Sequence, residues 1–176
     1  MSLGNDLLVS MINRLVNYKD LGDKTFTRLT DTDFHYSPNE ETNSIAVTIQ
    51  HMHGNMLSRW TDFLTSDGEK EWRRRDVEFS DQQFTKEQLV DLWEKGWTCF
   101  LTTLKSLDEQ DLLKTIFIRA QGISVIDALN RQLAHYSYHT GQIIYIAKII
   151  KNKNWVSLSV PRGESTIFNK KMRNKE

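Results

Sequence analysis

The chain has 176 residues, which is enough for one domain with a sizeable hydrophobic core. Hydrophobic residues make up 39% and charged residues 26%, as in an ordinary globular protein, and 23 basic and 23 acidic residues give a formal net charge of zero. This balance provides no broad electrostatic attraction, so we expect neither nucleic acid nor a membrane surface as a partner.

Cysteine usage and hydropathy indicate the compartment. Cys99 is the only cysteine, so no internal disulfide can form and a reducing compartment is favoured. The most apolar stretch, residues 143–150, is too short to cross a bilayer, and residues 1–6 lack the layout of a signal peptide. We therefore expect a cytoplasmic protein in which Cys99 is a buried structural thiol.

Helical periodicity begins near the amino terminus. Apolar residues line one side of residues 6–29, which predicts a first helix. Residues 30–43 have the composition of a loop. Ser44 or Asn43 is a suitable cap for a second helix, which we expect to continue to about residue 64.

A long irregular connection separates the second helix from the third. It covers residues 66–83 and contains the run Arg73-Arg74-Arg75. A connection of this length is usually functional or packed over the body of the domain. The arginines could recognise an anionic substrate, but pairing with neighbouring acidic residues on a solvated loop is the more common role. The capping-box pattern of residues 85–88 then predicts a third helix, which ends near residue 107.

The last third of the chain combines an extended segment with a fourth helix. Residues 115–118 are β-prone, and with Gly122 they can form a small hairpin or extended crossover. Ser124 is a suitable cap for a helix that reaches about residue 150. Apolar residues after position 152 suggest a tail that docks on the helices, whereas residues 169–176 are polar.

These elements predict an all-α fold. We expect an up-and-down four-helix bundle with a short extended crossover before the last helix and a docked C-terminal tail. Residues 1–168 would form one domain, and residues 169–176 a polar tail. Trp60, Trp93 and Trp97 fall at helix positions that favour an aromatic core.

Two histidines of the predicted fourth helix are the strongest indication of chemistry. His135 and His139 are four residues apart, so they lie on one face of that helix. The same stripe continues through Ile143 and Ile146, which places the pair on an inward-facing side. Buried imidazoles need partners, and one metal ion would satisfy both. A pair alone is nevertheless a structural or surface feature about half the time.

A third ligand would have to come from another element. His51 and His53 lie on the second helix about 200° apart, so only one of them can face the same ion. Small and polar residues surround His51, whereas apolar residues surround His53, so the helical wheel favours His51. His35 lies in a loop and is a poor candidate. Near the cavity, Asn55, Arg131, Tyr138 and Gln142 could orient a ligand, although helix packing or solvation is the more common role for each.

The positions of these histidines resemble the DinB/YfiT-like superfamily of metal-dependent helical bundles, and in particular a Bacillus-type branch of it. The resemblance covers nearly the whole chain and rests on three separated motifs in the same order: His51-Met52-His53-Gly54-Asn55, Arg131-Gln132-Leu133-Ala134-His135-Tyr136-Ser137-Tyr138-His139, and Leu158-Ser159-Val160-Pro161-Arg162-Gly163. The resemblance implies that His51, His135 and His139 bind a divalent metal ion. Imidazole ligands suit zinc, nickel, iron and copper alike, and of these we expect zinc, nickel or iron.

Three neutral imidazoles leave such an ion with its full charge and an open coordination position. An ion of this kind activates a bound water or thiol as a nucleophile at neutral pH. No His-Glu-x-x-His or Glu-x-x-His motif accompanies the histidines, which argues against a zincin protease and a di-iron carboxylate centre.

Two functional hypotheses follow. Some members of the superfamily are thiol S-transferases, so the resemblance implies a transferase that activates a low-molecular-weight thiol; a hydrolase is less favoured. The alternative is a non-catalytic homodimeric bundle whose metal site is structural or vestigial and which serves as a stress-related binding protein. The nature of the fourth coordination position separates these hypotheses.

Overall fold

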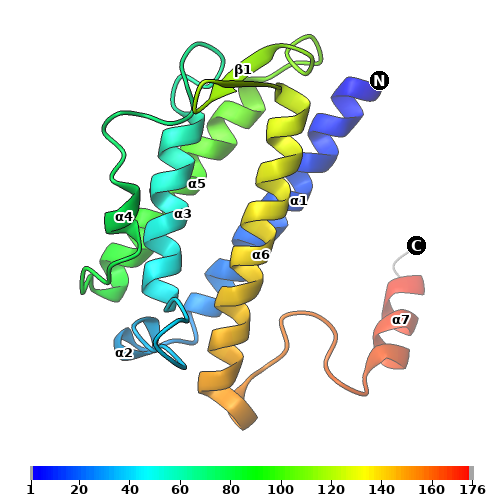
Figure 1. Cartoon of the computed structure of the whole chain (residues 1–176). Coiled ribbons are helices and arrows are strands. Elements are labelled where there is room, and N and C mark those ends of the chain that lie inside the picture. Colours follow the sequence, from blue (N-terminus) through cyan, green and yellow to red (C-terminus); the bar gives the residue numbers. More distant parts are fainter. Residues whose placement is uncertain (1, 175–176) are drawn as a thin grey trace.

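The structure is a computed structural model that describes residues 2–174. This part of the chain is mostly helical and also contains one two-stranded sheet (Figure 1). Its four long helices are α1 (Leu3–Phe26), α3 (Ile45–Trp60), α5 (Lys86–Ser106) and α6 (Val125–Lys151). The shorter elements are α2 (Asp31–Phe34), α4 (Arg75–Glu78), the 3-10 helix η1 (Asn152–Asn154), α7 (Ser165–Arg173), β1 (Thr115–Ile118) and β2 (Gln121–Ser124).

A serine or threonine caps the N-terminus of each of the four long helices. The side chains of Ser2, Ser44, Thr85 and Ser124 each accept a hydrogen bond from a backbone N–H of the first helical turn. Such a cap satisfies one of the donors that a helix start leaves free. At Thr85 the side chain of Gln88 also accepts from the cap N–H, which completes the predicted capping box.

Aromatic side chains fill the centre of the helical body. Trp60, Trp93 and Trp97 are at most 1% exposed, so the prediction that they form an aromatic core is confirmed. The indole N–H of Trp60 donates to the hydroxyl of Tyr136 at 3.0 Å, and that hydroxyl donates to Oδ1 of Asn55 at 3.1 Å. These bonds satisfy polar groups that would otherwise be costly to bury.

The direction of the helices differs from the predicted up-and-down order. Helices α3 and α5 are neighbours that run in the same direction (Figure 1). In the middle of α3, His53 bonds to the carbonyl of Leu92, and at the end of α3 the carbonyl of Trp60 accepts from Thr103, so residue numbers rise together along the two helices. Parallel neighbours require a long return connection. Residues 61–85 form this connection. They are numerous enough to return along α3, whose 16 residues span only about 24 Å.

This return connection packs along α3. Of the two roles expected for residues 66–83, function or packing over the body of the domain, the contacts show packing. The side-chain amide of Gln50 donates to the carbonyls of Glu78 and Ser80, and the hydroxyl of Ser58 donates to the carbonyl of Gly68. Helix α4 therefore lies beside α3 (Figure 1). Its last residue, Glu78, bonds to His51.

A short hairpin connects α5 to α6, so the predicted extended crossover is confirmed. Strands β1 and β2 are antiparallel, with Thr115 opposite Ser124 and Ile118 opposite Gln121. The two turn residues between them, Arg119 and Ala120, have φ values of 54° and 60°. Positive φ at both positions is typical of the turn whose twist matches antiparallel strands.

Only the first part of the C-terminal segment docks on the helices. Trp155 packs against the core, and the guanidinium of Arg28 lies 5.0 Å from the centre of its ring. In contrast, α7 is exposed along its whole length and lies apart from the long helices (Figure 1). The expected docking is therefore wrong for α7, whose apolar side chains Ile167, Phe168 and Met172 stay exposed. This helix also crosses the predicted boundary at residue 168, and residues 175–176 of the expected polar tail lie outside the described residues.

Among the described helices, none combines the length and the hydropathy that a membrane span requires.

Candidate metal centre

Three histidines from two helices converge inside the body of the protein. His51 comes from α3, and His135 and His139 come from α6. Each offers one nitrogen, and these three atoms lie within 4.8 Å of one another. The Nε2 atoms of His51 and His135 are 3.3 Å apart. Two nitrogens bound to one tetrahedral zinc ion at about 2.0–2.1 Å would be separated by roughly 3.3–3.4 Å, so this pair already has a suitable spacing.

The remaining ring nitrogens determine which atoms are free to bind a metal. Nδ1 of His51 donates to the Glu78 carboxylate at 3.0 Å, and Nδ1 of His139 donates to Oε1 of Gln142 at 2.8 Å. In both rings Nε2 is then the unprotonated atom, as in a metal-binding imidazole oriented by an outer partner. Two buried nitrogens, Nε2 of His139 and Nδ1 of His135, have no hydrogen-bond partner among the described residues. A buried polar atom without a partner is costly, so these residues fit a divalent cation.

The environment keeps two of the imidazoles neutral. Burial lowers the pKa of His135 to about 3, with further contributions from the neighbouring His139 and His51. Burial and the nearby His51 also lower the pKa of His139, to about 4. Metal ligation requires the unprotonated ring, which both residues therefore supply at neutral pH.

Glu78 is the outer partner of His51, and it comes from the return connection. Its carboxylate also accepts two hydrogen bonds from the guanidinium of Arg73, at 2.8 and 2.9 Å. Burial alone raises the pKa of Glu78, but the hydrogen bonds from Arg73 and His51 outweigh it, so the pKa lies below the ordinary value. Glu78 is therefore ionised at neutral pH and fixes the orientation of the His51 ring.

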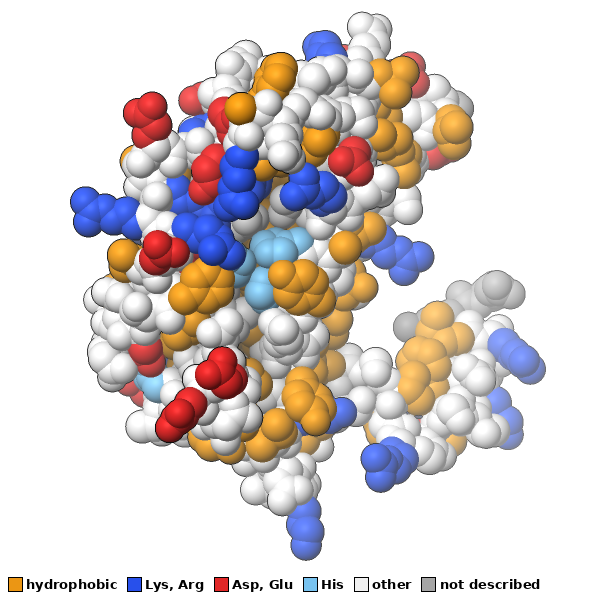
Figure 2. Space-filling model, viewed as in Figure 1, with side chains coloured by type: hydrophobic (Ala, Val, Ile, Leu, Met, Phe, Trp, Pro, Cys, Tyr) orange, Lys and Arg blue, Asp and Glu red, His pale blue; other side chains and the backbone are white. Residues whose placement is uncertain are grey.

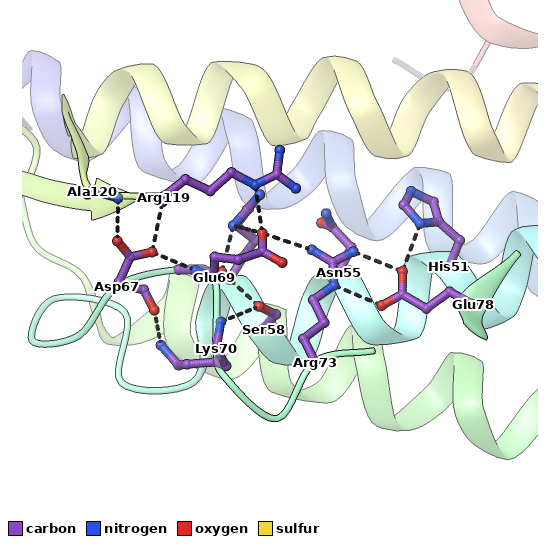
Figure 3. Close-up of polar contacts among 12 residues, drawn as sticks. His51, Asn55, Ser58, Asp67, Glu69, Lys70, Arg73, Glu78, Arg119 and Ala120 are labelled. Atoms are coloured by element: carbon purple, nitrogen blue, oxygen red, sulfur yellow. Dashed lines mark hydrogen bonds and ion pairs between the residues drawn. The ribbon is translucent and has the colours of Figure 1, made fainter. Parts of the chain in front are cut away.

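A polar network extends from His51 to the hairpin (Figure 3). Behind Glu78, Arg73 lies 3.5 Å from the carboxylate of Glu69, which also accepts from Arg59 at 3.2 Å and from Arg119 at 3.1 Å. Asp67 then accepts from the backbone N–H groups of Arg119 and Ala120. The network ties the return connection to α3 and to the hairpin turn, so it holds Glu78 in place.

The histidines line an open cavity of about 510 Å³. This volume is in the usual range for a small-molecule site. Basic side chains gather beside the histidines on this face of the molecule (Figure 2). On another side of the site, the ring of Phe79 lies 4.7 Å from that of His51, and the ring of Tyr138 lies 4.2 Å from that of His139. Three imidazoles therefore border a space that is large enough for a ligand.

The other sequence candidates divide into two groups. Asn55, Arg131 and Tyr138 line the cavity, and Gln142 bonds to a histidine, so all four lie near the site. His53 bonds instead to the carbonyl of Leu92, and His35 bonds to Asp81 and to the carbonyl of Phe84. Neither His35 nor His53 belongs to the histidine cluster.

Sequence reasoning missed the role of Glu78 and misjudged Arg73. Pairing of Arg73 with acidic neighbours is confirmed, but the expected solvated loop is wrong for this residue, because its side chain is only 2% exposed. The cause is the parallel course of α3 and α5, which makes the connection return across the site. The length of that connection was the only available signal.

Comparison with known families identifies the chain. No curated protein matches it. Residues 2–164 match the model of a family described as protein of unknown function, DUF1572. This match covers nearly the whole chain and includes all three histidines of the site, and we conclude that the protein belongs to the DUF1572 family.

Proposed function

We propose that this protein is a metal-dependent enzyme that transfers a low-molecular-weight thiol to an electrophile, with His51, His135 and His139 as the metal ligands. The observation that carries the proposal is the convergence of these imidazoles with buried, unpartnered nitrogens beside an open cavity. A divalent ion held there lowers the pKa of a thiol or water in its open position and thereby supplies a nucleophile at neutral pH.

The chain's own residues have defined roles in this reaction. His51 is held by Glu78, and His139 by Gln142, so both rings keep their orientation during turnover. Phe79 and Tyr138 provide aromatic surface beside His51 and His139 against which the apolar part of a substrate can pack. In the reaction the sulfur forms a bond to an electrophilic carbon, the leaving group departs with its electron pair, and the thiol proton passes to solvent. Because a divalent ion would lower the pKa of the bound thiol, this proton can pass to solvent without a general base from the protein.

The proposal includes membership of the DinB/YfiT-like superfamily and its four-helix-bundle architecture. The four long helices and the position of the histidines on α3 and α6 support this assignment. We further propose that the protein is a cytoplasmic homodimer. Exposed apolar side chains on two helices, including Val9 and Val16 on α1 and Tyr145 and Ile149 on α6, support a second copy as the partner.

Metal analysis tests the foundation of the proposal. Protein purified without a histidine tag, and then reconstituted with zinc, nickel or iron(II), is expected to bind about one equivalent of metal. The His135→Ala variant is expected to bind far less, whereas His53→Ala, two residues from His51 on α3, is expected to keep the site. Equal metal content in wild type and His135→Ala would exclude the site.

An activity assay tests the reaction. The metal-loaded protein is mixed with a panel of low-molecular-weight thiols and monochlorobimane, whose chloride leaves when the carbon–sulfur bond forms. We expect thiol-dependent fluorescence that His135→Ala loses. Equal rates for the two proteins would reject catalysis at the site.

A fourth protein ligand, or cavity walls closed over the ion, would favour the non-catalytic alternative. No fourth histidine, cysteine or carboxylate joins the cluster among the described residues. That observation favours the catalytic hypothesis. A large fall in melting temperature on chelation, without detectable turnover of any thiol, would favour the alternative.

A further inference from the structure

The wall of the histidine cavity has an unusual composition. Five of the chain's ten arginines line it, namely Arg59, Arg73, Arg75, Arg119 and Arg131. No lysine, aspartate or glutamate lines the cavity among the described residues. Because the whole chain has equal numbers of basic and acidic residues, this concentration of one charge is local to the cavity.

Three of these arginines form ion pairs with acidic residues that do not line the cavity. Arg59 and Arg119 bond to Glu69, and Arg73 bonds to Glu78. The side chains of Arg59 and Arg73 are at most 8% exposed. These two arginines therefore serve mainly to hold the polar network together, and two carboxylates offset part of the charge of the three guanidinium groups.

The other two arginines make no ion pair within residues 2–174. Arg131 lies on α6 one turn before His135, and therefore on the same face of the helix. Arg75 lies on α4 one turn before Phe79, with its guanidinium carbon 5.1 Å from the centre of the Phe79 ring. That ring in turn packs against His51. The two uncompensated cations thus come from different elements and flank the same three histidines.

A third polar group of the wall also lacks a partner. Gln132 follows Arg131 on α6 and is 5% exposed. Its side-chain oxygen is buried and accepts no hydrogen bond within the described part of the chain. An N–H or O–H group elsewhere on a ligand would satisfy this acceptor, whereas the two arginines would bind the anionic group of the ligand.

We propose that the histidine cavity binds a small anionic substrate, and that Arg75 and Arg131 hold its carboxylate or phosphate group beside the three histidines. The inference rests on the proposed function, because it names the substrate class of the same site. A guanidinium presents two parallel N–H donors that match the two oxygens of a carboxylate or phosphate. The use of arginine alone, without lysine, is consistent with this geometry.

Anion binding can be measured without turnover. The full chain, in both metal-free and zinc-loaded forms, is titrated calorimetrically at low ionic strength with succinate and with inorganic phosphate. Succinamide, which has nearly the same shape as succinate but no charge, is the control ligand. We expect at least one anion to bind to both forms of the protein, and succinamide to bind much more weakly.

Matched variants locate the binding. Arg75→Gln and Arg131→Gln are each expected to weaken anion binding roughly ten-fold or more, because each removes a charge-assisted hydrogen bond. Arg131→Lys is expected to restore part of the affinity. Arg14→Gln, at an exposed position of α1 outside the cavity, is expected to bind as wild type does.

The outcomes separate this inference from the proposed function. Protein that binds metal but neither anion would overturn the inference alone, as would equal losses in Arg131→Gln and Arg14→Gln. Anion binding that depends on Arg75 and Arg131 in protein that fails to bind metal would support the inference and remove the metal-dependent function.

Discussion

The Nε2 atoms of His51 and His135 lie 3.3 Å apart, although 84 positions separate the two residues in the chain. Neither nitrogen bonds to a carboxylate, since Glu78 bonds to Nδ1 of His51. In the absence of metal, one ring can donate to the other at this distance. This spacing is also that of two nitrogens bound to one tetrahedral zinc ion, so little rearrangement is needed to accept an ion.

This organisation depends on Glu78, which leads to the first prediction. We expect Glu78→Gln to lower zinc affinity by about 10- to 100-fold, because loss of the charged outer partner weakens the hold on His51 and the basicity of its ring. Competition with a chromophoric chelator measures the change.

The control for this variant is Glu71→Gln, which removes an exposed charge from the same connection. Glu78→Gln is also expected to melt at lower temperature, because buried Arg73 loses its main partner. Affinity is therefore measured well below the melting transition. Identical zinc affinity in the two variants would contradict the assigned role of Glu78.

Gly54 permits the close approach of Glu78 to α3. A Cβ atom at position 54 would lie 2.2 Å from Oε1 of Glu78, which is too close for both atoms to remain in place. Because a carboxylate end can move more easily than backbone, we expect Gly54→Ala to fold but to displace Glu78. Zinc affinity should then fall as it does in Glu78→Gln.

Gly141→Ala is the matched control, since a Cβ atom there meets nothing within 4 Å. Position 141 lies on α6, so alanine is expected to stabilise the protein by about 0.5–1 kcal/mol through helix propensity, with unchanged zinc affinity. Urea denaturation and the same chelator competition measure both quantities. A Gly54→Ala variant that binds zinc as tightly as Gly141→Ala would refute the steric argument.

Local patterns in the sequence indicated the pair His135 and His139 and favoured His51 over His53, whereas the set of three ligands followed from the family resemblance. The i, i+4 spacing fixes His135 and His139 on one face, and the helical wheel distinguishes His51 from His53 because helical periodicity extends over all of α3. The helix starts at Ser44 and Ser124 could also be predicted from the sequence, because an N-cap is a local interaction.

The outer partner of His51 was not predictable in this way. Residues 61–85 have no periodicity that determines their direction, and the parallel packing of α5 on α3 depends on contacts such as that between Trp60 and Phe100, which are far apart in the sequence. Only that packing brings Glu78 to His51. The same reason explains why Arg73 was expected in solvent rather than in a buried ion pair.

The buried hydroxyl of Tyr136 provides a test of the core. It accepts from Trp60 and donates to Asn55, and its side chain is fully buried. We expect Tyr136→Phe to reduce the free energy of unfolding by roughly 1–3 kcal/mol, because it leaves two buried polar groups without a partner. Tyr145→Phe, at a residue that is 67% exposed, should change it by less than about 0.5 kcal/mol. Equal stability of the two variants in urea denaturation would show that the buried hydrogen bonds contribute nothing net.

The stability of the metal-free protein should depend on pH in a defined window. Burial lowers the pKa of His135 to about 3 and that of His139 to about 4, whereas the ordinary value is 6.5. Below pH 6.5 the unfolded chain therefore binds protons that the folded protein does not, so the free energy of unfolding falls as the pH decreases. Each histidine is expected to contribute about 1.4 kcal/mol of this loss between pH 7.5 and pH 5.5, or roughly 3 kcal/mol for the pair.

Urea denaturation of the metal-free protein at these two pH values measures the loss, and the chosen window excludes the carboxyl groups. The pKa of Glu78 is lowered from 4.5, so its unfolded form takes up few protons at pH 5.5. Burial also lowers the pKa of His53, which adds to the loss in the same direction. His135→Asn should therefore reduce the pH dependence by the share of one histidine. Unchanged stability of the wild-type protein between pH 7.5 and 5.5 would mean that the imidazoles of the site are not held neutral by burial.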